Sequence, residues 1–298
     1  MKQQQTTVSA TLHHKPKVKV STICMYVFLS IAAFVSIFPL VWTLISATNS
    51  NADVLAGRLI PGANLAENWR NLTAQQNVLL AFWNSARNAI VLTIGSLLIC
   101  SLAGYGFEVF HSKWKDRLMG VLLLSMMVPF AAIMIPMFTM FGRMNEAMPD
   151  FGMFSGWLGM LNGTLGFILP TLATAFLVML FRQSARSFPH DMVEAARIDG
   201  LSEISIFFRI FMPTMKSTYA AAAIITFMAA WNVFLWPRLI MMGPDSVTLP
   251  LMLSSLLGGY VIDNGVNMLA VVIATVPTVV LFFFLQKHFA EGMAGSVK

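Results

Sequence analysis

The residues that most often carry enzymatic chemistry are widely separated in this sequence. Nucleophilic, acid–base and metal chemistry need such residues at fixed spacings, for example H-E-x-x-H, closely paired cysteines or G-x-S-x-G. None of these patterns occurs. The histidines and cysteines lie in polar segments, at helix ends or inside apolar runs: His13, His14, His111, His190, His288, Cys24 and Cys100. The sequence therefore predicts no catalytic residue, no metal site and no cofactor.

A phosphate-binding loop is also missing. In the G-x-x-x-x-G-K-[ST] loop, backbone N–H groups surround the phosphates and the lysine balances their charge. No lysine in this chain follows a glycine. We therefore expect that the chain does not hydrolyse ATP itself.

The segment 182–214 carries the strongest local signals. Pro189 breaks the preceding helix, Asp191 is a suitable N-cap, and Glu194 three residues later completes a variant of the capping box. We expect a short helix to begin at Asp191. Gly200 stands where a left-handed residue would end that helix after about two turns.

A second short helix is expected to follow, capped by Ser202 and running to Pro213. One face of the first helix presents small side chains that allow another surface to come close. This face is formed by Met192, Ala195, Ala196 and Asp199. Spacing alone leaves two interpretations equally open, a docking surface or a loop packed on its own bundle.

The elements that must position this segment are apolar helices. Of the 298 residues, 57% are hydrophobic and 11% are charged, whereas soluble domains average about 25% charged residues. Apolar runs reach the roughly 18 residues at which a membrane-spanning helix becomes the default expectation. The sequence predicts an all-α polytopic membrane protein with six transmembrane helices, over 21–46, 86–107, 117–141, 160–181, 215–236 and 266–286.

The basic charge of the chain indicates topology. An even number of spans puts both termini on one side, and that side receives fourteen of the 19 Lys and Arg residues. By the positive-inside rule, the N- and C-termini are cytoplasmic. Nucleic acid is not needed to explain the net charge of +6.

This topology divides the chain into segments. We expect a cytoplasmic tail over 1–20 near lipid headgroups, a first span over 21–46 that is too long for a cleaved signal peptide, an extracytoplasmic loop over 47–85 and a C-terminal cytoplasmic tail over 288–298.

The helix midplanes are expected to hold no ionisable residue, which argues against proton- or sodium-driven carriers.

Polar side chains in or near the spans are candidates for a solute path. A neutral, hydrogen-bonding lining would suit a polyhydroxy solute. The candidates are Asn162, Thr226, Trp231, Asn232 and Thr275. Interhelical hydrogen bonding is an equally good explanation for each of them. For Trp231 and Trp236, a place in an interfacial aromatic belt is favoured.

At this point the sequence resembles a known family. The segment from Glu194-Ala195-Ala196 through Gly200 to Ile210-Phe211-Met212-Pro213 resembles the E-A-A-x3-G-x9-I-x-L-P loop of inner-membrane permeases of binding-protein-dependent ABC importers, with Met212 replacing Leu. Further matches are Asn84-Ser85, Gly104-Tyr105-Gly106-Phe107, Trp231-Asn232 and Phe234-Leu235-Trp236-Pro237. The resemblance covers about 82–287 and is closest to maltose-type sugar permeases.

The resemblance implies a fold, a function and partners. It implies the type I ABC importer permease fold in the bacterial inner membrane, a transmembrane domain over 82–287, and import of a sugar, with an oligosaccharide favoured. It also implies a second permease subunit, an ATPase dimer and an extracytoplasmic solute-binding protein. ATPase coupling would fall to Glu194, Ala195, Ala196, Asp199, Gly200 and Pro213 in the loop 182–214.

Alternatives remain at this stage. Within the family, glycerol-3-phosphate or another polar organic solute is possible, and five extracytoplasmic arginines could meet an anion. A secondary carrier would need intramembrane ionisable residues or inverted repeats, which the sequence lacks. A passive channel would leave the loop 182–214 unexplained.

The charge distribution gives a first testable prediction. A single cysteine introduced into 108–116 or 182–214 should resist a membrane-impermeant thiol reagent applied to intact cells, because both segments face the cytoplasm. The same reagent should label a cysteine placed in 47–85. Labelling of the first two segments from outside would overturn the predicted topology.

Overall fold

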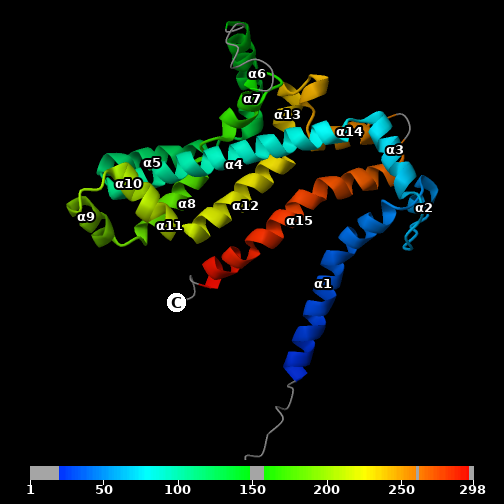
Figure 1. The fold of residues 1–298 in the computed structure, drawn as a ribbon, viewed down its shortest axis with the longest axis horizontal. Helices are drawn as coiled ribbons and strands as arrows, with labels where there is room; N and C mark the ends of the chain where they lie inside the picture. The colour runs from blue at the N-terminus through cyan, green and yellow to red at the C-terminus, as the bar shows by residue number, and fades with distance from the viewer. Residues whose placement is uncertain (1–19, 148–157, 260–261, 295–298) are drawn as a thin grey trace, which may run out of the picture.

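The computed structural model describes residues 20–147, 158–259 and 262–294. Within these ranges the regular structure is helical and there is no strand. Figure 1 shows three long helices, α4 (Val78–Val109), α12 (Lys216–Asn232) and α15 (Asn264–Ala294), lying next to one another in a bundle. The all-α fold predicted from the sequence is confirmed.

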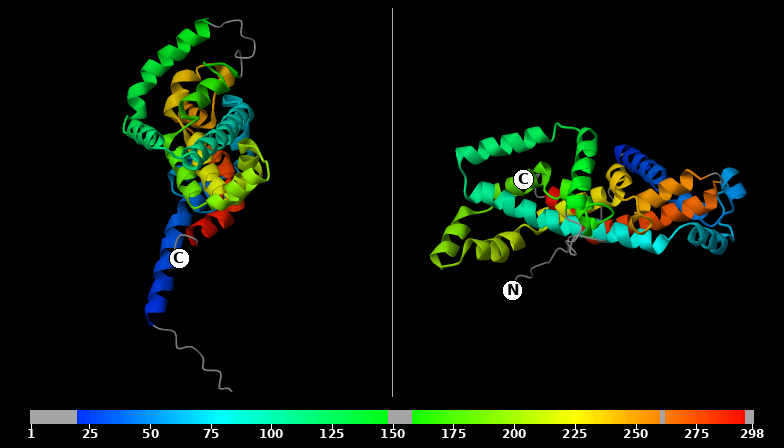
Figure 2. Two further views of the ribbon diagram at one scale, coloured as in Figure 1. Left: turned by 90° about the vertical axis from the view of Figure 1, so that its left-hand side faces the viewer. Right: turned by 90° about the horizontal axis from the view of Figure 1, so that it is seen from above.

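The first helix stands apart from this bundle. α1 (Val20–Ser46) agrees with the predicted span 21–46, and Ser46 at its end is its one buried residue. Its large apolar side chains are exposed over most of its length, which suits a helix surrounded by lipid or by another protein. Figure 2 shows α1 leaving the bundle from the end where it meets α15. The predicted tail 1–20 lies almost wholly outside the described residues.

Hydrogen bonds from Asn68 fix the end of α1 to the bundle. Two short helices follow it, α2 (Asn51–Leu55) and α3 (Leu65–Gln75). The buried Asn68 side chain donates to the carbonyl oxygens of Ala47 and Asn49, at 2.9 and 3.0 Å. Because these carbonyls directly follow α1, the two bonds fix the chain after the helix to α3.

α4 is the central helix. It packs against α8 (Ala175–Arg186) and α12, which also contact each other, and α12 in turn packs against α15. α4 begins at Val78, earlier than the predicted span 86–107. Arg87 therefore lies in the first third of the helix and is half-buried. The absence of ionisable residues at the helix midplanes stays a prediction.

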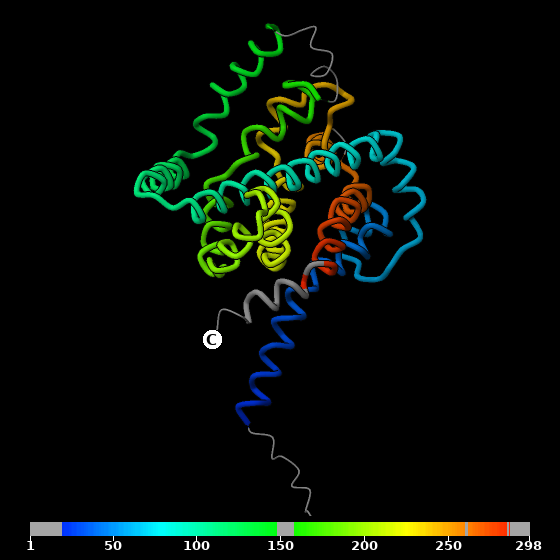
Figure 3. Tube along the Cα trace, turned by 60° about the vertical axis from the view of Figure 1, so that its left-hand side comes forward, coloured from blue at the N-terminus to red at the C-terminus, as the bar shows by residue number. Residues whose placement is uncertain are grey.

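Two of the predicted spans are sharply bent. The span 117–141 is divided into α5 (Lys113–Ser125) and α6 (Phe130–Ala147), which meet at 95°. Pro129 disfavours helical geometry at the residue before it, so α5 ends and a new helix begins at Phe130. Figure 3 shows α6 projecting away from the bundle. The prediction of one continuous helix here is wrong.

The span 160–181 is broken in the same way. α7 (Thr164–Ile168), a 3₁₀ turn (Leu169–Thr171) and α8 follow one another, with a bend of 56°. The Thr174 hydroxyl accepts a hydrogen bond from the Leu177 amide at 3.3 Å and caps α8. The capped start explains why the chain begins a new helix here instead of continuing the old one.

The remaining helices of the bundle are α12 to α15. α12 has 17 residues and is followed by α13 (Leu235–Ile240) and α14 (Leu249–Leu257). α15 continues as a helix to Ala294, so the predicted C-terminal tail 288–298 begins within a helix.

By length and composition, the described residues hold three helices able to cross a membrane, or up to five if each bent pair counts as one. α12, at about 1.5 Å per residue, is about 26 Å long and lies at the lower limit for a span. The chain is thus a helical polytopic membrane protein; among the described residues three of the six predicted spans are single long helices, two are bent pairs and one is the short α12.

The crossing of α4 and α8 gives a second prediction. A Cβ atom added at Gly104 would lie 2.7 Å from the Phe181 Cβ and 2.8 Å from the Arg182 amide nitrogen, whereas Gly106 has no atom within 4 Å. Gly104→Ala should therefore destabilise the protein by about 1–3 kcal/mol through overpacking. Gly106→Ala, the matched control, should not. Thermal unfolding in detergent measures both, and equal stability of the two variants would contradict the close packing.

Candidate functional site

The segment 182–214 folds as a helical hairpin at one end of the bundle. Its first arm is α9 (His190–Ile198), and its second arm contains α10 (Glu203–Ile206), a π-helical turn (Phe207–Phe211) and α11 (Met212–Thr214). In Figure 1 this hairpin forms the end of the molecule opposite α2 and α3. The predicted helix–turn–helix is confirmed in outline.

The start of α9 differs from the prediction. The helix begins at His190, with Pro189 as the N-cap residue and no side-chain capping bond. Asp191 lies in the first turn, where its charge favours the positive end of the helix dipole. Proline sets an extended conformation at position 189 and thereby ends α8 and starts α9 without needing a polar cap. The prediction of Asp191 as N-cap is wrong.

The turn between the arms follows the prediction closely. Gly200 has φ of +80°, the left-handed conformation. The Gly200 amide donates to the Arg197 carbonyl at 3.0 Å, and the Leu201 amide donates to the Ala196 carbonyl at 3.0 Å. This pair of bonds is the Schellman arrangement, which satisfies the last carbonyls of a helix. The second arm then starts at Ser202, whose hydroxyl accepts a bond from the Ser205 amide at 3.3 Å.

The two arms enclose a small core of their own. Phe207 and Phe211 are almost completely buried and pack against Tyr105 of α4, with ring centroids 5.5 and 4.9 Å apart. Val193 and Ala196 of α9 belong to the same core. Pro213, predicted as part of the site, is exposed in α11. The hairpin is therefore a packed unit seated on the end of α4.

This core changes the membership of the predicted docking face. Glu194, Ala195 and Asp199 are exposed as expected, but Ala196 is 4% exposed and faces the hairpin core. In its place, Ile198 is 86% exposed. Ile198 is not part of the predicted face, because the spacing of the alanines places it elsewhere; a large apolar residue next to a polar turn is the signal that could have indicated it.

Polar contacts hold the hairpin to α4. Glu203 accepts a hydrogen bond from the Arg197 side chain at 2.6 Å and another from the Tyr105 hydroxyl at 3.2 Å. The Arg197 hydrogen bond lowers the pKa of Glu203, and Glu203 raises the pKa of Arg197. Because the pKa of Glu203 is depressed by folding, this contact stabilises the hairpin above the ordinary Glu pKa and weakens as the pH falls below it.

The predicted path residues are not gathered at one place. Thr226 is buried and lines a cavity of about 380 Å³ with Thr171 and Thr174, beside the bends of α5–α6 and α7–α8. Its hydroxyl has no hydrogen-bond partner among the described residues. Thr275 instead lines a groove of about 300 Å³ between α1 and α15, and its hydroxyl donates to the Val271 carbonyl at 2.8 Å.

Asn162 and Asn232 have local structural contacts. Asn162 has φ of 60°, and its side-chain oxygen accepts bonds from the Gly243 amide and the Ser246 hydroxyl at 2.7 and 3.1 Å. It thereby connects the segment before α7 to the loop after α13. The Asn232 side chain donates to the Met228 carbonyl of its own helix at 2.8 Å.

The two tryptophans do not form an interfacial belt. Trp231 and Trp236 are 3% and 2% exposed. Their indole N–H groups donate to backbone carbonyls, Trp231 to Ala274 at 2.9 Å and Trp236 to Gly166 at 2.8 Å. The belt interpretation is wrong because tertiary packing of α12 and α13 against α15 and α7 buries both rings.

The described residues contain no group of three His, Cys, Asp or Glu side chains able to hold a metal ion. The arrangement offers two features that could bind other molecules. One is a packed hairpin exposed at one end of the bundle, and the other is an apolar cavity with threonine hydroxyls next to two broken helices.

Comparison with known proteins identifies related chains. A family model described as "binding-protein-dependent transport system inner membrane component" matches residues 95–295. The lactose transport system permease protein LacG of Rhizobium radiobacter is 44% identical over 276 residues, covering 93% of this chain and 96% of that protein. The arabinooligosaccharides transport system permease protein AraQ of Bacillus subtilis is 30% identical, covering 96% and 99%.

Two further comparisons add to this. The sn-glycerol-3-phosphate transport system permease protein UgpE of Escherichia coli is 29% identical over 93% of this chain and 97% of its own length. A chain in the crystal structure of a bacterial ABC transporter involved in the import of the acidic polysaccharide alginate superposes with a TM-score of 0.75, covering 92% of this chain and all of that chain at 19% identity. This last likeness shows a shared fold.

The Gly200 turn gives a third prediction. Because nothing lies within 4 Å of an added Cβ there, a substitution acts through the backbone conformation alone. Gly200→Val should weaken the hairpin by about 1–2 kcal/mol, whereas Gly200→Asn should be much milder since Asn tolerates the left-handed region. Hydrogen exchange of the α9 amides measures the difference. Equal exchange in the Val and Asn variants would refute the role of this conformation.

Proposed function

Because the chain belongs to the family of binding-protein-dependent transport system inner membrane components, we propose that it forms a solute path together with a second permease chain. The chain is a permease subunit of an ABC importer, a transport component and not an enzyme, in the bacterial inner membrane. A pair of ATPase subunits drives transport from the cytoplasm, and an extracytoplasmic binding protein delivers the solute.

The exposed hairpin is the observation that carries this proposal. α9 presents Ala195, Ile198 and Asp199 to the surroundings, while Val193 and Ala196 hold the helix on its own core. Ile198, a large apolar side chain that is 86% exposed next to Asp199, fits an apolar pocket of a partner. We assign the ATPase contact to this face, with Glu194, Gly200 and Pro213 shaping it.

Orientation follows from charge. The hairpin and the turn between α4 and α5 contribute many of the basic residues, so both are placed in the cytoplasm with the two termini. The outer end then holds α2, α3 and α14, and the segments 47–85 and 237–265 become the surfaces for the binding protein. The boundaries of the transmembrane domain, about 82–287, are part of the same proposal.

The solute is proposed to be a sugar, with an oligosaccharide or disaccharide favoured. The relatives LacG and AraQ are named for lactose and arabinooligosaccharides. The cavity that holds Thr171, Thr174 and Thr226 contains hydroxyl groups and no ionisable side chain, which suits a neutral polyhydroxy solute. Glycerol-3-phosphate is the second candidate, because UgpE is named for it. Its anionic phosphate would lack a cationic partner in this cavity.

A fourth prediction tests docking at α9. Ile198→Glu should leave folding intact, since the side chain is exposed, yet weaken binding of the cognate ATPase subunit at least about tenfold by placing a carboxylate in an apolar contact. Ile204→Glu on α10, where Ile204 is 70% exposed, is the matched control. Titration of ATPase subunit onto purified permease measures both affinities.

A transport assay tests the function and the identity of the solute. In it, the complex of the permease subunits and the ATPase subunits is reconstituted in liposomes together with the binding protein. Wild type should take up a neutral disaccharide on addition of ATP and not glycerol-3-phosphate, and the Ile198 variant should lose this uptake. Unchanged affinity and uptake in the Ile198 variant would contradict docking at α9, and uptake of glycerol-3-phosphate alone would contradict the solute assignment.

A further inference from the structure

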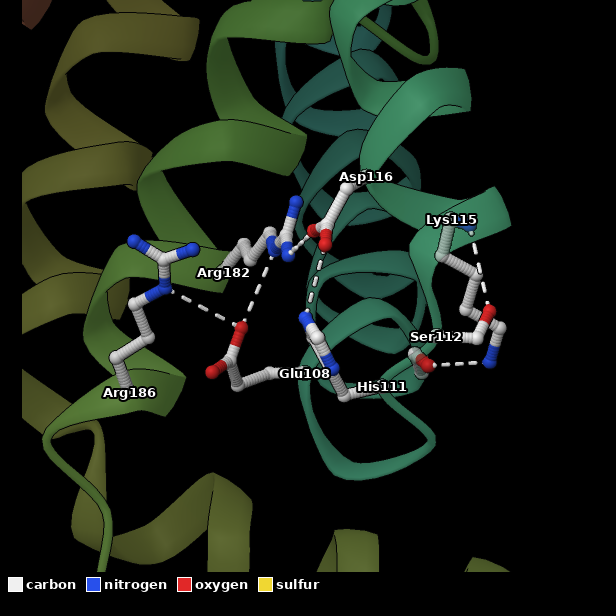
Figure 4. A network of polar contacts seen from close by, with 8 residues as sticks. Glu108, His111, Ser112, Lys115, Asp116, Arg182 and Arg186 are labelled. Atoms are coloured by element: carbon white, nitrogen blue, oxygen red, sulfur yellow. Dashed lines mark hydrogen bonds and ion pairs between the residues drawn. The ribbon is translucent and has the colours of Figure 1, made fainter.

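A cluster of ion pairs joins three helix ends beside the hairpin. Arg182 of α8 has a side chain only 4% exposed, and its Nε lies 3.2 Å from the Glu108 carboxylate at the end of α4. A terminal nitrogen of the same guanidinium contacts the Asp116 carboxylate in the first turn of α5. Arg186 lies 3.4 Å from Glu108, and His111 Nε2 lies 3.0 Å from Asp116 (Figure 4).

The chemistry of Arg182 suits a joint between helices. A guanidinium presents several N–H donors in a fixed plane, so one side chain can bind two carboxylates from different helices. Burial makes these pairs less screened by water and salt than surface pairs. The Arg182 guanidinium also lies over the Phe107 ring at 5.9 Å, which restricts its orientation further.

α5 is attached to the bundle by apolar and polar contacts. Met119, its one buried residue, belongs to the same apolar cluster as Leu177 and Phe181 of α8, and Lys115 donates to the Gly106 carbonyl at 2.8 Å. The contact between Asp116 and Arg182 adds an ion pair between α5 and α8 to this apolar packing. After α5 the chain turns through 95° into α6, which projects from the bundle (Figure 3).

α8 is in turn joined firmly to the hairpin. Phe188, directly after α8, is buried and packs on Phe211 of the second arm with ring centroids 5.6 Å apart. Between Phe188 and α9 there is only Pro189. Packed side chains thus connect the docking face to α8, and Arg182 continues the connection to α5.

From this geometry we propose that Arg182 is a positioning residue for transport, which makes α5 move with the hairpin as one body while the bend between α5 and α6 serves as the hinge. The inference rests on the proposed function, in which ATPase subunits displace the hairpin. Arg182 does not touch solute or nucleotide in this account; it acts through the position of α5.

The sharpest variant is Asp116→Asn. It weakens the link to α5 but leaves Arg182 paired with Glu108, and the Asp116 side chain is 44% exposed, so folding tolerates the change. Arg186→Gln is the matched control, because it removes an ion pair of the same cluster, to Glu108, without touching α5. His111→Gln controls for the second contact of Asp116.

The first readout is solute transported per ATP hydrolysed by complexes of equal subunit content. We expect Asp116→Asn to lower this ratio about tenfold, within the range of about 5- to 150-fold found for coupling between sites. Arg186→Gln and His111→Gln should stay close to wild type. If Asp116→Asn keeps the wild-type ratio, or the controls lose as much, Arg182 is only structural and the inference fails. An inactive wild-type complex would instead count against the proposed function.

The second readout does not depend on the variants. Spin labels are placed at exposed positions of α5 (Leu118), α6 (Ile135) and the hairpin (Ile204), after replacement of the exposed Cys24. On ATP binding to the assembled complex, the α5–hairpin distance should stay constant and the α6–hairpin distance should change. A change in the α5–hairpin distance as large as that of α6 would overturn the inference.

Discussion

The structure depends on the close approach of two helix backbones, α4 and α8. Gly104 permits this approach because it has no side chain at the crossing. The close crossing places the next residue, Tyr105, in the hairpin core and brings Glu108 to Arg182. α8 then ends before Pro189, which starts α9. The exposed face with Ile198 is therefore positioned by one backbone contact some distance away in the chain.

The same crossing connects the hairpin to the rest of the bundle. Its contribution is a stiff path of packed side chains between an exposed hairpin and two broken helices. The breaks lie beside the cavity that contains Thr226, so a displacement at the hairpin and a change of shape at the cavity involve adjoining elements. The family to which the chain belongs is that of binding-protein-dependent transport system inner membrane components.

Features set by local sequence were predictable. The charge-free run of α1, the left-handed Gly200 and the cap at Ser202 each depend on residues within one or two turns, and the structure agrees with all three. One local prediction also failed, because Pro189 and not Asp191 is the N-cap residue of α9. Other predictions failed because they depend on distant residues. Ala196 is turned inward by Phe207 and Phe211, and Trp231 is buried because α15 offers the Ala274 carbonyl. A proline such as Pro129 signals a break, but the angle of 95° is set by packing that the sequence does not display.

The central claim is that the face of α9 around Ile198 meets the ATPase subunit in the cytoplasm. The most direct measurement replaces Ile198 by a photoreactive amino acid in the assembled importer in cells, followed by irradiation and mass-spectrometric identification of the product. The account predicts a crosslink to the ATPase subunit from position 198 and none from Leu55, which is 72% exposed in α2 at the opposite end of the molecule. A crosslink to that subunit from position 55, or none from position 198, would contradict it.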